Sequence, residues 1–472
     1  MNKILYILFT VIIVTGLYSC TESDDYSSDS GLKLMFSSDT ITFDTVFTTV
    51  GSATQTFKIY NKNNKSLVIE SIEVMNPQKS GFQMNVDGES GSRLENVDIL
   101  KKDSLYGFLR VTIDPQNVNN PVLIRDSIRF ITNGNVQYLY LEAIGRDVYK
   151  WDGKSLSVDT VITDEKPILI YDTLRISENV NITIKENTEL YFHHKSSLQV
   201  YGTLKAEGTV DKPIVFRGDR LDNINGAVPY DNVPGQWEGI VFHSESYNNR
   251  LENVVIKNAV TGIKFLSSTT QYRKASLINT LVHNSLGKGL EASDCDIEAI
   301  NCQFTNARDV LLDLSGGKYS FLHTTIANYY IWTNRIAASV ILRDKYQDTG
   351  LPTTFEQCDF INSIIYGSIS SELILPDNGG GSQNYRFHNC LIRNREEYSN
   401  THFSNVIWNK NPEFVDVNKN GYYYYDFRLQ STSPAIDKAD RTYSLSVPFD
   451  IKGNSRLSDA NPDLGCYEWI QE

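Results

Sequence analysis

The sequence has little positive charge and few histidines. Its 472 residues include 44 Lys and Arg against 57 Asp and Glu, a formal net charge of −13, with only seven His and four Met. A nucleic-acid partner requires a basic face, and so does charge-driven binding to anionic lipid, so this composition argues against both. Apolar residues make up 40% and charged residues 21%, which is typical of globular proteins and excludes wholesale disorder.

Cysteines with the spacing of a disulfide framework or a zinc site are also missing. Five of the six cysteines lie between residues 295 and 466 at wide intervals, and no C-x-x-C motif occurs. We therefore expect free, buried thiols, no metal and no cofactor. The run Asp416-Val-Asn-Lys-Asn-Gly421 imitates the start of a calcium loop, but its twelfth position is Phe427, so a plain turn is favoured over a calcium site.

No apolar run at the N-terminus is long enough to span a membrane comfortably. Residues 4–17 supply about 14 positions, whereas a spanning helix needs about 20. The run ends in Leu17-Tyr-Ser-Cys20, which resembles a bacterial lipobox. Residues 1–19 are therefore predicted to be a lipoprotein signal peptide, with Cys20 lipidated and attached to the membrane. A plain signal peptide is the alternative.

The acidic segment that follows, residues 20–31, lacks large aliphatic side chains and is predicted to be a flexible tether. An acidic run directly after the lipidated cysteine resembles the surface-export signal of Bacteroidetes lipoproteins. The resemblance implies an outer-membrane lipoprotein exposed on the cell surface. A tether facing the periplasm is the alternative.

Strand-forming and turn-forming residues are abundant. The chain has 41 Asn, 29 Gly, 27 Tyr and 21 Phe, which predicts an all-β protein. In residues 32–147 about seven short alternating strands, such as Phe108-Leu-Arg-Val-Thr-Ile113, predict an Ig-like β-sandwich. The order Val50-Gly51, Ile59-Tyr-Asn61, Leu67-Val-Ile69 and a closing Gly145 resembles ASH/MSP-type Ig-like domains. We see no catalytic constellation here and expect a spacer or docking module.

A six-residue unit then recurs at intervals of 22 to 34 residues, with the form (Asn/His/Gln)-x-x-(large apolar)-x-Asn. The copies are Asn253–Asn258, Asn279–Asn284, Asn301–Asn306, His323–Asn328, Gln357–Asn362 and Asn389–Asn394. Such a period of strands and turns predicts a solenoid. By period 2, the second and fourth positions of each unit point inward, and the closing Asn residues are expected to bond from coil to coil.

The solenoid is predicted to be a right-handed parallel β-helix over residues 150–407. Upstream segments such as Val200-Tyr-Gly-Thr-Leu204 and Trp237-Glu-Gly-Ile-Val-Phe242 resemble bacterial β-helix repeat proteins of the pectin-lyase-like fold. The repeat also predicts that Cys302, Cys358 and Cys390 share one inward column as free thiols.

The C-terminal residues 408–472 carry further motifs. Asn411-Pro-Glu-Phe414, Ser433-Pro-Ala-Ile-Asp437, Asp450-Ile-Lys-Gly453 and Asp463-Leu-Gly-Cys-Tyr-Glu468 resemble the choice-of-anchor Q domain of extracellular β-helix proteins. Cys466 stands where that family usually has Ala. We expect this segment to cap the open end of the solenoid, where strand edges would otherwise be bare.

Three long insertions between coils, at residues 218–236, 329–352 and 366–386, are the candidate binding loops. Aromatic rings among Asp, Asn and Arg suit a polysaccharide ligand, whose apolar ring faces stack and whose hydroxyls form hydrogen bonds. The candidate ligand-binding residues are Tyr230, Asp231, Trp237, Trp332 and Tyr385.

Signals for catalysis are thin, and no catalytic residue is assigned. Asp294, Asp296 and Glu298 alternate along one predicted strand, but a solvated acidic face explains them better than paired catalytic carboxylates. The favoured hypothesis is a non-catalytic binding or adhesion platform for glycans. The alternative is a carbohydrate-active enzyme, either a polysaccharide lyase or a glycoside hydrolase. The ligand and the oligomeric state are left open.

Overall fold

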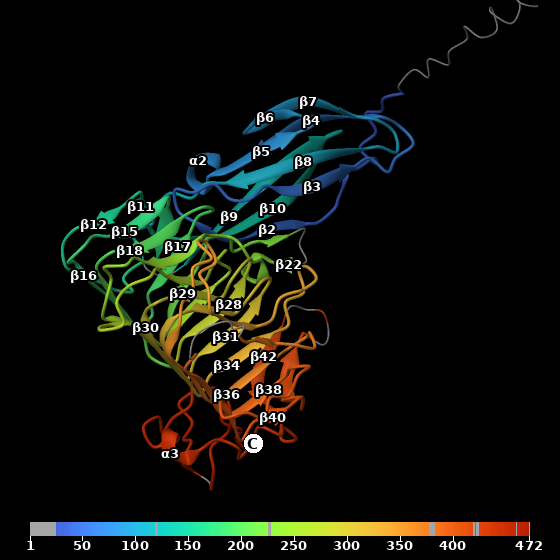
Figure 1. The fold of residues 1–472 in the computed structure, drawn as a ribbon. Helices are drawn as coiled ribbons and strands as arrows, with labels where there is room; N and C mark the ends of the chain where they lie inside the picture. The colour runs from blue at the N-terminus through green and yellow to red at the C-terminus, as the bar shows by residue number, and fades with distance from the viewer. Residues whose placement is uncertain are drawn as a thin grey trace, which may run out of the picture. The chain divides into compact units, whose positions relative to one another are not determined.

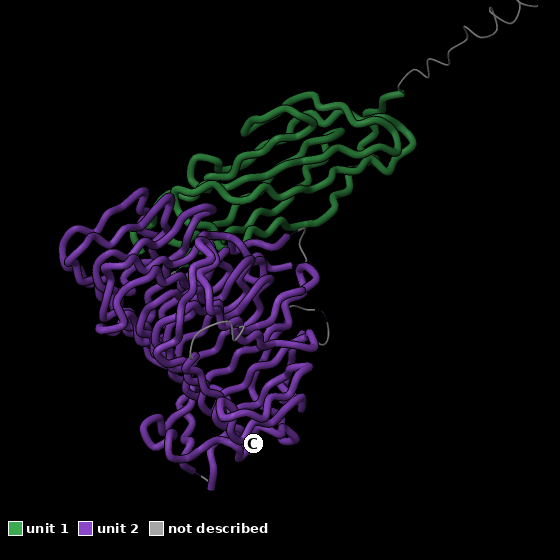
Figure 2. The backbone as a smooth tube through the Cα atoms, in the orientation of Figure 1, with its two compact units in different colours: residues 1–147 green, residues 148–472 purple. Residues whose placement is uncertain are grey.

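The computed structural model describes residues 25–118, 121–224, 228–376, 383–418, 421, 424–458 and 460–471. The chain is 51% strand and 3% helix, which confirms the prediction of an all-β protein. It divides into two compact units, residues 1–147 and 148–472 (Figure 2). The predicted signal peptide and the predicted lipidation site, Cys20, lie outside the described residues.

Unit 1 consists of two five-stranded sheets and one short helix, α2 (Pro77–Ser80). The first sheet has the order β1 (Met35–Phe36), β3 (Gln55–Tyr60), β8 (Ser104–Val111), β5 (Phe82–Val86) and β6 (Glu89–Gly91). The second has the order β2 (Thr40–Phe47), β10 (Asn135–Arg146), β9 (Val122–Thr132), β4 (Leu67–Val74) and β7 (Arg93–Ile99). Apolar residues at alternate positions of these strands form one buried core cluster.

Unit 2 repeats a coil of three short strands (Figure 1). Two of the three belong to a 19-stranded sheet and the third to a 9-stranded sheet, and each pairs in parallel with its counterpart in the next coil. Parallel strands lie about 4.8 Å apart, so each coil adds about that length to the stack. This stacking of parallel coils is consistent with a parallel β-helix.

The strand bounds of unit 2 are as follows. The large sheet contains β11 (Tyr149–Asp152), β13 (Thr160–Ile162), β14 (Ile168–Tyr171), β16 (Asn181–Lys185), β17 (Glu189–Phe192), β19 (Thr203–Glu207), β20 (Ile214–Gly218), β24 (Asn249–Glu252), β25 (Val254–Lys257), β27 (Arg273–Ile278), β28 (Leu281–Ser285), β30 (Asp296–Ile300), β31 (Gln303–Ala307), β33 (Gly317–Leu322), β34 (Thr325–Asn328), β36 (Phe355–Gly367), β38 (Tyr385–Ile392), β39 (Phe403–Ser404) and β40 (Ile407–Trp408). The 9-stranded sheet contains β12 (Ser155–Leu156), β15 (Thr173–Ile176), β18 (Ser197–Val200), β23 (Gly239–Phe242), β26 (Ile263–Phe265), β29 (Leu290–Ser293), β32 (Leu312–Ser315), β35 (Val340–Arg343) and β37 (Leu373–Ile374). Two hairpins, β21 (Asn223–Ile224) with β22 (Val228–Pro229) and β41 (Phe414–Val417) with β42 (Tyr425–Leu429), lie outside these sheets.

Stacked phenylalanines fill the C-terminal half of the coil interior. Phe321, Phe360, Phe387 and Phe403 form a ladder with ring centroids 4.7, 4.9 and 4.9 Å apart and nearly parallel planes. Each such contact contributes about 0.5–1.5 kcal/mol beyond the buried area. The ladder shows why a large apolar residue recurs at the same inward position of each coil.

The turns between strands carry asparagine columns. The closing Asn of two successive units bond to each other, with Asn284 Nδ2 donating to Asn258 Oδ1 at 2.9 Å, as predicted for these residues. The opening positions form a second column, in which Asn279 donates to Asn253 and Asn301 donates to Asn279. These opening residues adopt the left-handed conformation, with φ of 48–52°, which Asn tolerates better than most side chains.

One predicted copy of the repeat is out of register. Phe360 pairs with Phe321, whereas Ile365 pairs with Ile326, so residues 357–362 belong to the preceding strand position. The unit of this coil instead begins at Asn362, whose φ of 52° matches the other opening residues. The 13-residue strand β36 runs through both strand positions with one alternating pattern, so the pattern alone could not separate them.

The predicted cysteine column is wrong for the same reason. Cys358 pairs with Tyr385, and Ser363 is the residue that pairs with Cys390. The five cysteines between residues 295 and 466 are nevertheless free and buried, as predicted. Burial raises the pKa of the Cys302 and Cys390 thiols to about 12, so both are inert packing groups.

The C-terminal segment contacts the sides of several coils. The expected cap over the open end of the solenoid stays a prediction. Tyr467 donates its hydroxyl to Gln303 Oε1 at 2.7 Å, and the Cys466 amide donates to Thr325 Oγ1 at 3.0 Å. The Asp440 amide donates to Asn362 Oδ1 at 2.8 Å. The segment also covers apolar residues on the outer face of β34, β36 and β38, among them Ala327 and the paired residues Ile364 and Leu391. The sequence analysis had assigned only the inward positions, so it did not detect this second apolar face.

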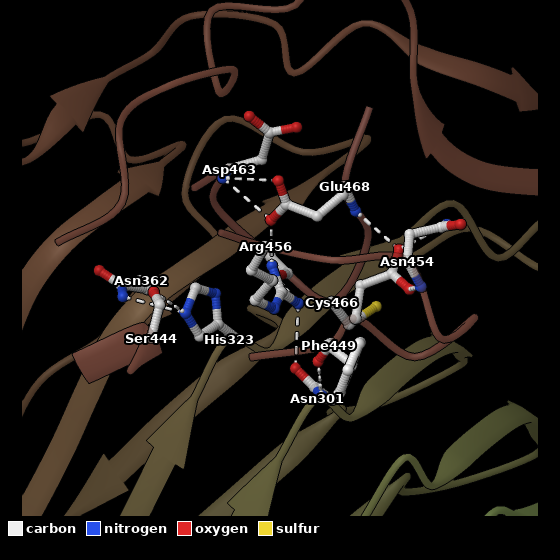
Figure 3. Close-up of polar contacts among 12 residues, drawn as sticks. Asn301, His323, Asn362, Ser444, Phe449, Asn454, Arg456, Asp463, Cys466 and Glu468 are labelled. Atoms are coloured by element: carbon white, nitrogen blue, oxygen red, sulfur yellow. Dashed lines mark hydrogen bonds and ion pairs between the residues drawn. The ribbon is translucent and has the colours of Figure 1, made fainter. Parts of the chain in front are cut away.

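A buried ion pair fastens the segment (Figure 3). Arg456, which is fully buried, donates to Glu468 Oε1 at 2.5 Å, to Asn301 Oδ1 at 3.0 Å and to the Gly465 carbonyl at 3.1 Å. Glu468 also accepts from the Asp463 amide at 3.0 Å. The pKa of Glu468 is raised to about 8, because burial raises it by more than the charge of Arg456 lowers it. The network ties the segment to the solenoid at Asn301.

Candidate functional site

The first insertion loop brings an acid onto the outer face of the large sheet of unit 2. A short 3₁₀ turn, η1 (Tyr230–Asn232), carries Asp231. Its carboxylate lies 2.9 Å from the Arg217 guanidinium and 2.7 Å from Lys257 Nζ. The side chain of Asp231 is 42% exposed, so this ionic cluster lies at the surface.

The cations of this cluster come from one outward column of the solenoid. Parallel register places Arg217 of β20 beside Lys257 of β25, because Val215 pairs with Val255, and Lys257 beside His283 of β28. Lys257 and His283 both occupy the fifth position of their repeat units, which period 2 directs outward. Reading the fifth position as a surface column would have found both residues, which the sequence analysis missed.

The ionisation states follow from burial and charge. Burial alone would raise the pKa of Asp231, but Arg217 and Lys257 lower it below its usual value, so the carboxylate is ionised. Burial and the charge of Arg217 lower the pKa of Lys257. Burial, together with Lys257, lowers the pKa of His283 to about 4, so this imidazole is neutral near pH 7.

Tyr230 lies next to Asp231 and is partly covered. The Arg220 guanidinium lies 4.0 Å from the centroid of the Tyr230 ring and pairs with Asp222 at 2.5 Å. The Tyr230 amide in turn donates to the Asp222 carbonyl at 2.9 Å. Tyr230 and Asp231 are thus the two predicted site residues that the structure brings together, and Arg220 shields one face of the ring.

A hollow of about 480 Å³ opens on the same face of the large sheet, next to the cation column. The ring of Tyr425, on β42, lines the hollow and lies 5.7 Å from the His283 ring, which links the hollow to the cluster. The remaining lining residues are Leu281, Gln303, Tyr424, Asp426, Phe427, Arg428, Lys452, Asn454 and Tyr467. The side of the solenoid and the C-terminal segment therefore build it jointly.

Two of the other three candidates, Trp237 and Tyr385, are buried. Trp237 is fully buried, stacks on Phe192 at 4.2 Å and donates its indole N–H to the Lys257 carbonyl, so it is a core residue. Tyr385 is only 6% exposed and stacks on His402 at 4.2 Å. Trp332 is half-buried on the second insertion loop. Aromatic residues are shared by interior ladders and binding faces, so residue type alone did not separate them.

The acidic strand residues do not converge into a catalytic pair. Asp294 accepts from Thr353 Oγ1 at 3.0 Å and from the Tyr346 hydroxyl, which fastens the second insertion loop. Asp296 and Glu298 both pair with Arg273, at 3.2 and 3.1 Å. Each of the three acids thus forms hydrogen bonds or ion pairs with neighbouring strands and loops.

The Asp231 cluster can recognise polar groups. Lys257 donates to the Asp231 carboxylate, which opposes but does not cancel the lowering of the Lys257 pKa by burial and Arg217. Within the described part of the chain, no group of three or more His, Cys, Asp or Glu side chains could hold a metal ion. Nor is there, among those same residues, a helix long and apolar enough to cross a membrane.

Comparisons with known proteins leave the family open. No protein-family model matches the chain, and no curated protein matches it. A protein of unknown function from Porphyromonas gingivalis W83 is similar over 27% of this chain and 51% of its own, at 14% identity and a TM-score of 0.19. A family 123 glycoside hydrolase from Clostridium perfringens, described for glycolipid glycan hydrolysis, is similar over 26% of this chain and 30% of its own, at 6% identity and a TM-score of 0.18. The chain thus spans about half of the first structure and less than a third of the second, and at these TM-scores neither carries an argument.

Proposed function

We propose that this chain is a surface-exposed lipoprotein of the outer membrane whose solenoid binds glycans without cleaving them. The membrane assignment rests on the lipobox-like end of the N-terminal apolar run, with Cys20 as the lipidated residue, and on the acidic run that follows it. The binding assignment rests on the hollow beside the Asp231 cluster.

The observation that carries the proposal is an exposed ring among hydrogen-bonding groups. Tyr424 is 57% exposed and lines the hollow together with Lys452, Arg428 and Asn454. Sugars offer an apolar ring face and a rim of hydroxyls, and this lining supplies partners for both. A volume of about 480 Å³ is within the usual range for small-ligand sites.

The alternative, a polysaccharide lyase or glycoside hydrolase, requires a free base or paired carboxylates next to the ligand. Lys257 is engaged by Asp231, and Asp426 is engaged by Arg428 at 2.7 Å. Both engagements favour binding over catalysis, and product analysis of any bound glycan separates the two functions.

The finer classification of the fold belongs to the same proposal. We infer that unit 1 is an Ig-like β-sandwich, because its strands form two sheets that share one core. We infer that the solenoid winds right-handed, because parallel strands joined by a crossover almost always do. The motifs of residues 408–472 support a choice-of-anchor Q segment, here placed against the side of the coils.

A glycan array probed with the purified chain, with Tyr424→Ala and with Tyr272→Ala tests the binding assignment. Tyr272 is 56% exposed and lies outside the hollow, so it is a matched control. We expect Tyr424→Ala to weaken binding of the best glycan about tenfold, since loss of a stacked ring costs on the order of 1.4 kcal/mol. Equal loss in both variants, or binding to no glycan, would exclude the hollow as the site. Mass spectrometry of the N-terminal peptide, with Cys20→Ala as control, tests the lipid.

A further inference from the structure

The outer face of the first sheet of unit 1 carries exposed aromatic rings. Tyr106 and Phe108 point outward from the middle strand, β8, and are 50% and 40% exposed. Two large aromatic side chains that lie next to each other on a sheet face expose a continuous apolar area to water. Such an area often marks a surface that contacts a ligand or partner. We call the surface made by Tyr106, Phe108 and Lys58 the aromatic face.

The rings of the aromatic face are held in place. Their centroids are 6.4 Å apart and their planes differ by 19°, while Lys58 Nζ lies 4.4 Å from the Tyr106 centroid. Between them, Gly107 faces the core, where a Cβ would lie 2.2 Å from the Phe57 ring. The backbone of β8 therefore packs directly on the core at Gly107, and this packing fixes the position from which the two rings extend.

A hollow adjoins the aromatic face at Phe108. It has a volume of about 850 Å³, near the upper end of small-ligand sites, and extends over β8, β5, β6 and α2. Register places Phe108 beside Asn85 of β5, and Asn85 beside Ser90 of β6. An aromatic ring, an amide and a hydroxyl thus form one row across the sheet.

The hollow also offers free hydrogen-bonding capacity. Arg110 lines it and donates Nε to Thr54 Oγ1 at 2.8 Å, and its terminal nitrogens have no partner among the described residues. The other polar lining side chains are Gln78, Gln83, Asn85, Ser90, Ser92, Thr112 and Asp114. Asn85 Nδ2 donates to Ser90 Oγ at 2.9 Å, so the acceptor Oδ1 is the group of Asn85 that is offered to a ligand. Amides, hydroxyls and a guanidinium beside flat rings suit a sugar chain, whose hydroxyls form hydrogen bonds and whose apolar ring faces stack.

We infer that unit 1 has a carbohydrate site of its own, with an oligosaccharide stacked on Tyr106 and Phe108 and hydrogen-bonded to Asn85 and Arg110. This site is made of other residues than the hollow on the solenoid, and it gives unit 1 a binding role where a spacer or docking module was expected. It does not depend on the function proposed for the solenoid.

The test is isothermal titration of the full chain with defined oligosaccharides of glucan, mannan, xylan and polygalacturonate. Phe108→Ala and Tyr106→Ala are compared with Tyr140→Ala, whose ring is 55% exposed on the second sheet of the same unit, outside the hollow. We expect at least one oligosaccharide to lose about tenfold or more in affinity with both variants and to be unaffected by Tyr140→Ala and by Tyr424→Ala.

Two results would overturn the inference: no oligosaccharide binds, or binding survives both variants of the aromatic face. Loss with Tyr424→Ala alone would support the solenoid site and refute the one in unit 1. Thermal unfolding of each variant serves as the folding control, since all four substitutions replace exposed side chains and should leave the transition in place.

Discussion

Replacing Arg456 by Met should detach the C-terminal segment from the solenoid. Met keeps much of the volume of the arginine stem but removes the guanidinium. Glu468 then loses its only cationic partner in this network, and the oxygen atoms of Asn301 and Gly465 each lose a hydrogen bond.

The magnitude follows from burial. The side chains of Arg456 and Glu468 are 0% and 4% exposed, so solvent cannot compensate for the lost charge. Above about pH 8, where Glu468 is ionised, removing one partner of a buried ion pair costs about 3–5 kcal/mol, a large fraction of the roughly 5–15 kcal/mol that holds a domain folded. The exposed pair of Arg428 and Asp426, with an arginine side chain 53% exposed, provides the contrast: Arg428→Ala should cost less than about 1 kcal/mol.

The loss should also depend on pH. With Arg456 in place, the pKa of Glu468 is already raised to about 8 by burial. Without the guanidinium it rises further, so the folded variant binds a proton that the unfolded chain releases at its ordinary pKa. Stability contributed by such a raised pKa is present at low pH and is lost as pH rises. The unmodified chain loses this contribution in the same way up to about pH 8. The stability gap between Arg456→Met and the unmodified chain should therefore open above about pH 8 and be smaller at pH 5 than at pH 9.

The assay is urea unfolding combined with limited proteolysis, read as release of fragments from residues 408–472. Adding Glu468→Gln to Arg456→Met should recover part of the loss, because no buried charge is then left unpaired. A loss below about 1 kcal/mol for Arg456→Met, equal to that of Arg428→Ala, would refute the buried-pair reasoning.

Two further substitutions test other buried groups. Burial lowers the pKa of Lys274 from 10.5 to about 8, so the unfolded chain binds more protons than the folded chain between these pH values. The stability of the unmodified chain relative to Lys274→Met should therefore rise by about 2–3 kcal/mol across that window, measured by urea titration. A stability difference that does not change with pH would contradict this prediction. Trp237→Ala should cost about 3–5 kcal/mol of stability, because it opens a cavity in the core beside Phe192. If the variant instead unfolds like the unmodified chain but loses glycan binding, Trp237 would be a ligand-binding residue after all.

The period-2 pattern of the sequence correctly predicted which side chains of each strand face the interior. The inward positions Ile256 and Phe304 are buried, and the closing Asn residues bond between coils, because strand geometry fixes which side chains face inward. Register was harder to predict. The alternating pattern continues along β36 without a break, so a shift of one strand position left every residue on its expected face while changing its neighbours in the stack.

The candidate site was harder still, because aromatic residues serve two purposes in a solenoid. Trp237 and Tyr385 belong to the interior, while Tyr424 and Tyr106 are exposed, and nothing in residue type separates them. The cation column could have been found from the fifth position of the repeat, where Lys257 and His283 stand. Its partner Asp231 arrives from an insertion loop, whose path the repeat does not determine.

The C-terminal motifs illustrate where binding should be sought in this molecule. Asp450 accepts from the Glu468 amide at 2.9 Å, Asp463 accepts from the Trp469 amide at 2.6 Å, and Arg456 pairs with Glu468. These contacts hold the segment closed, whereas Lys452 of the same motifs lines the hollow. The hollow beside Tyr424 and the aromatic face of unit 1 are two places where exposed rings and hydrogen-bonding side chains coincide.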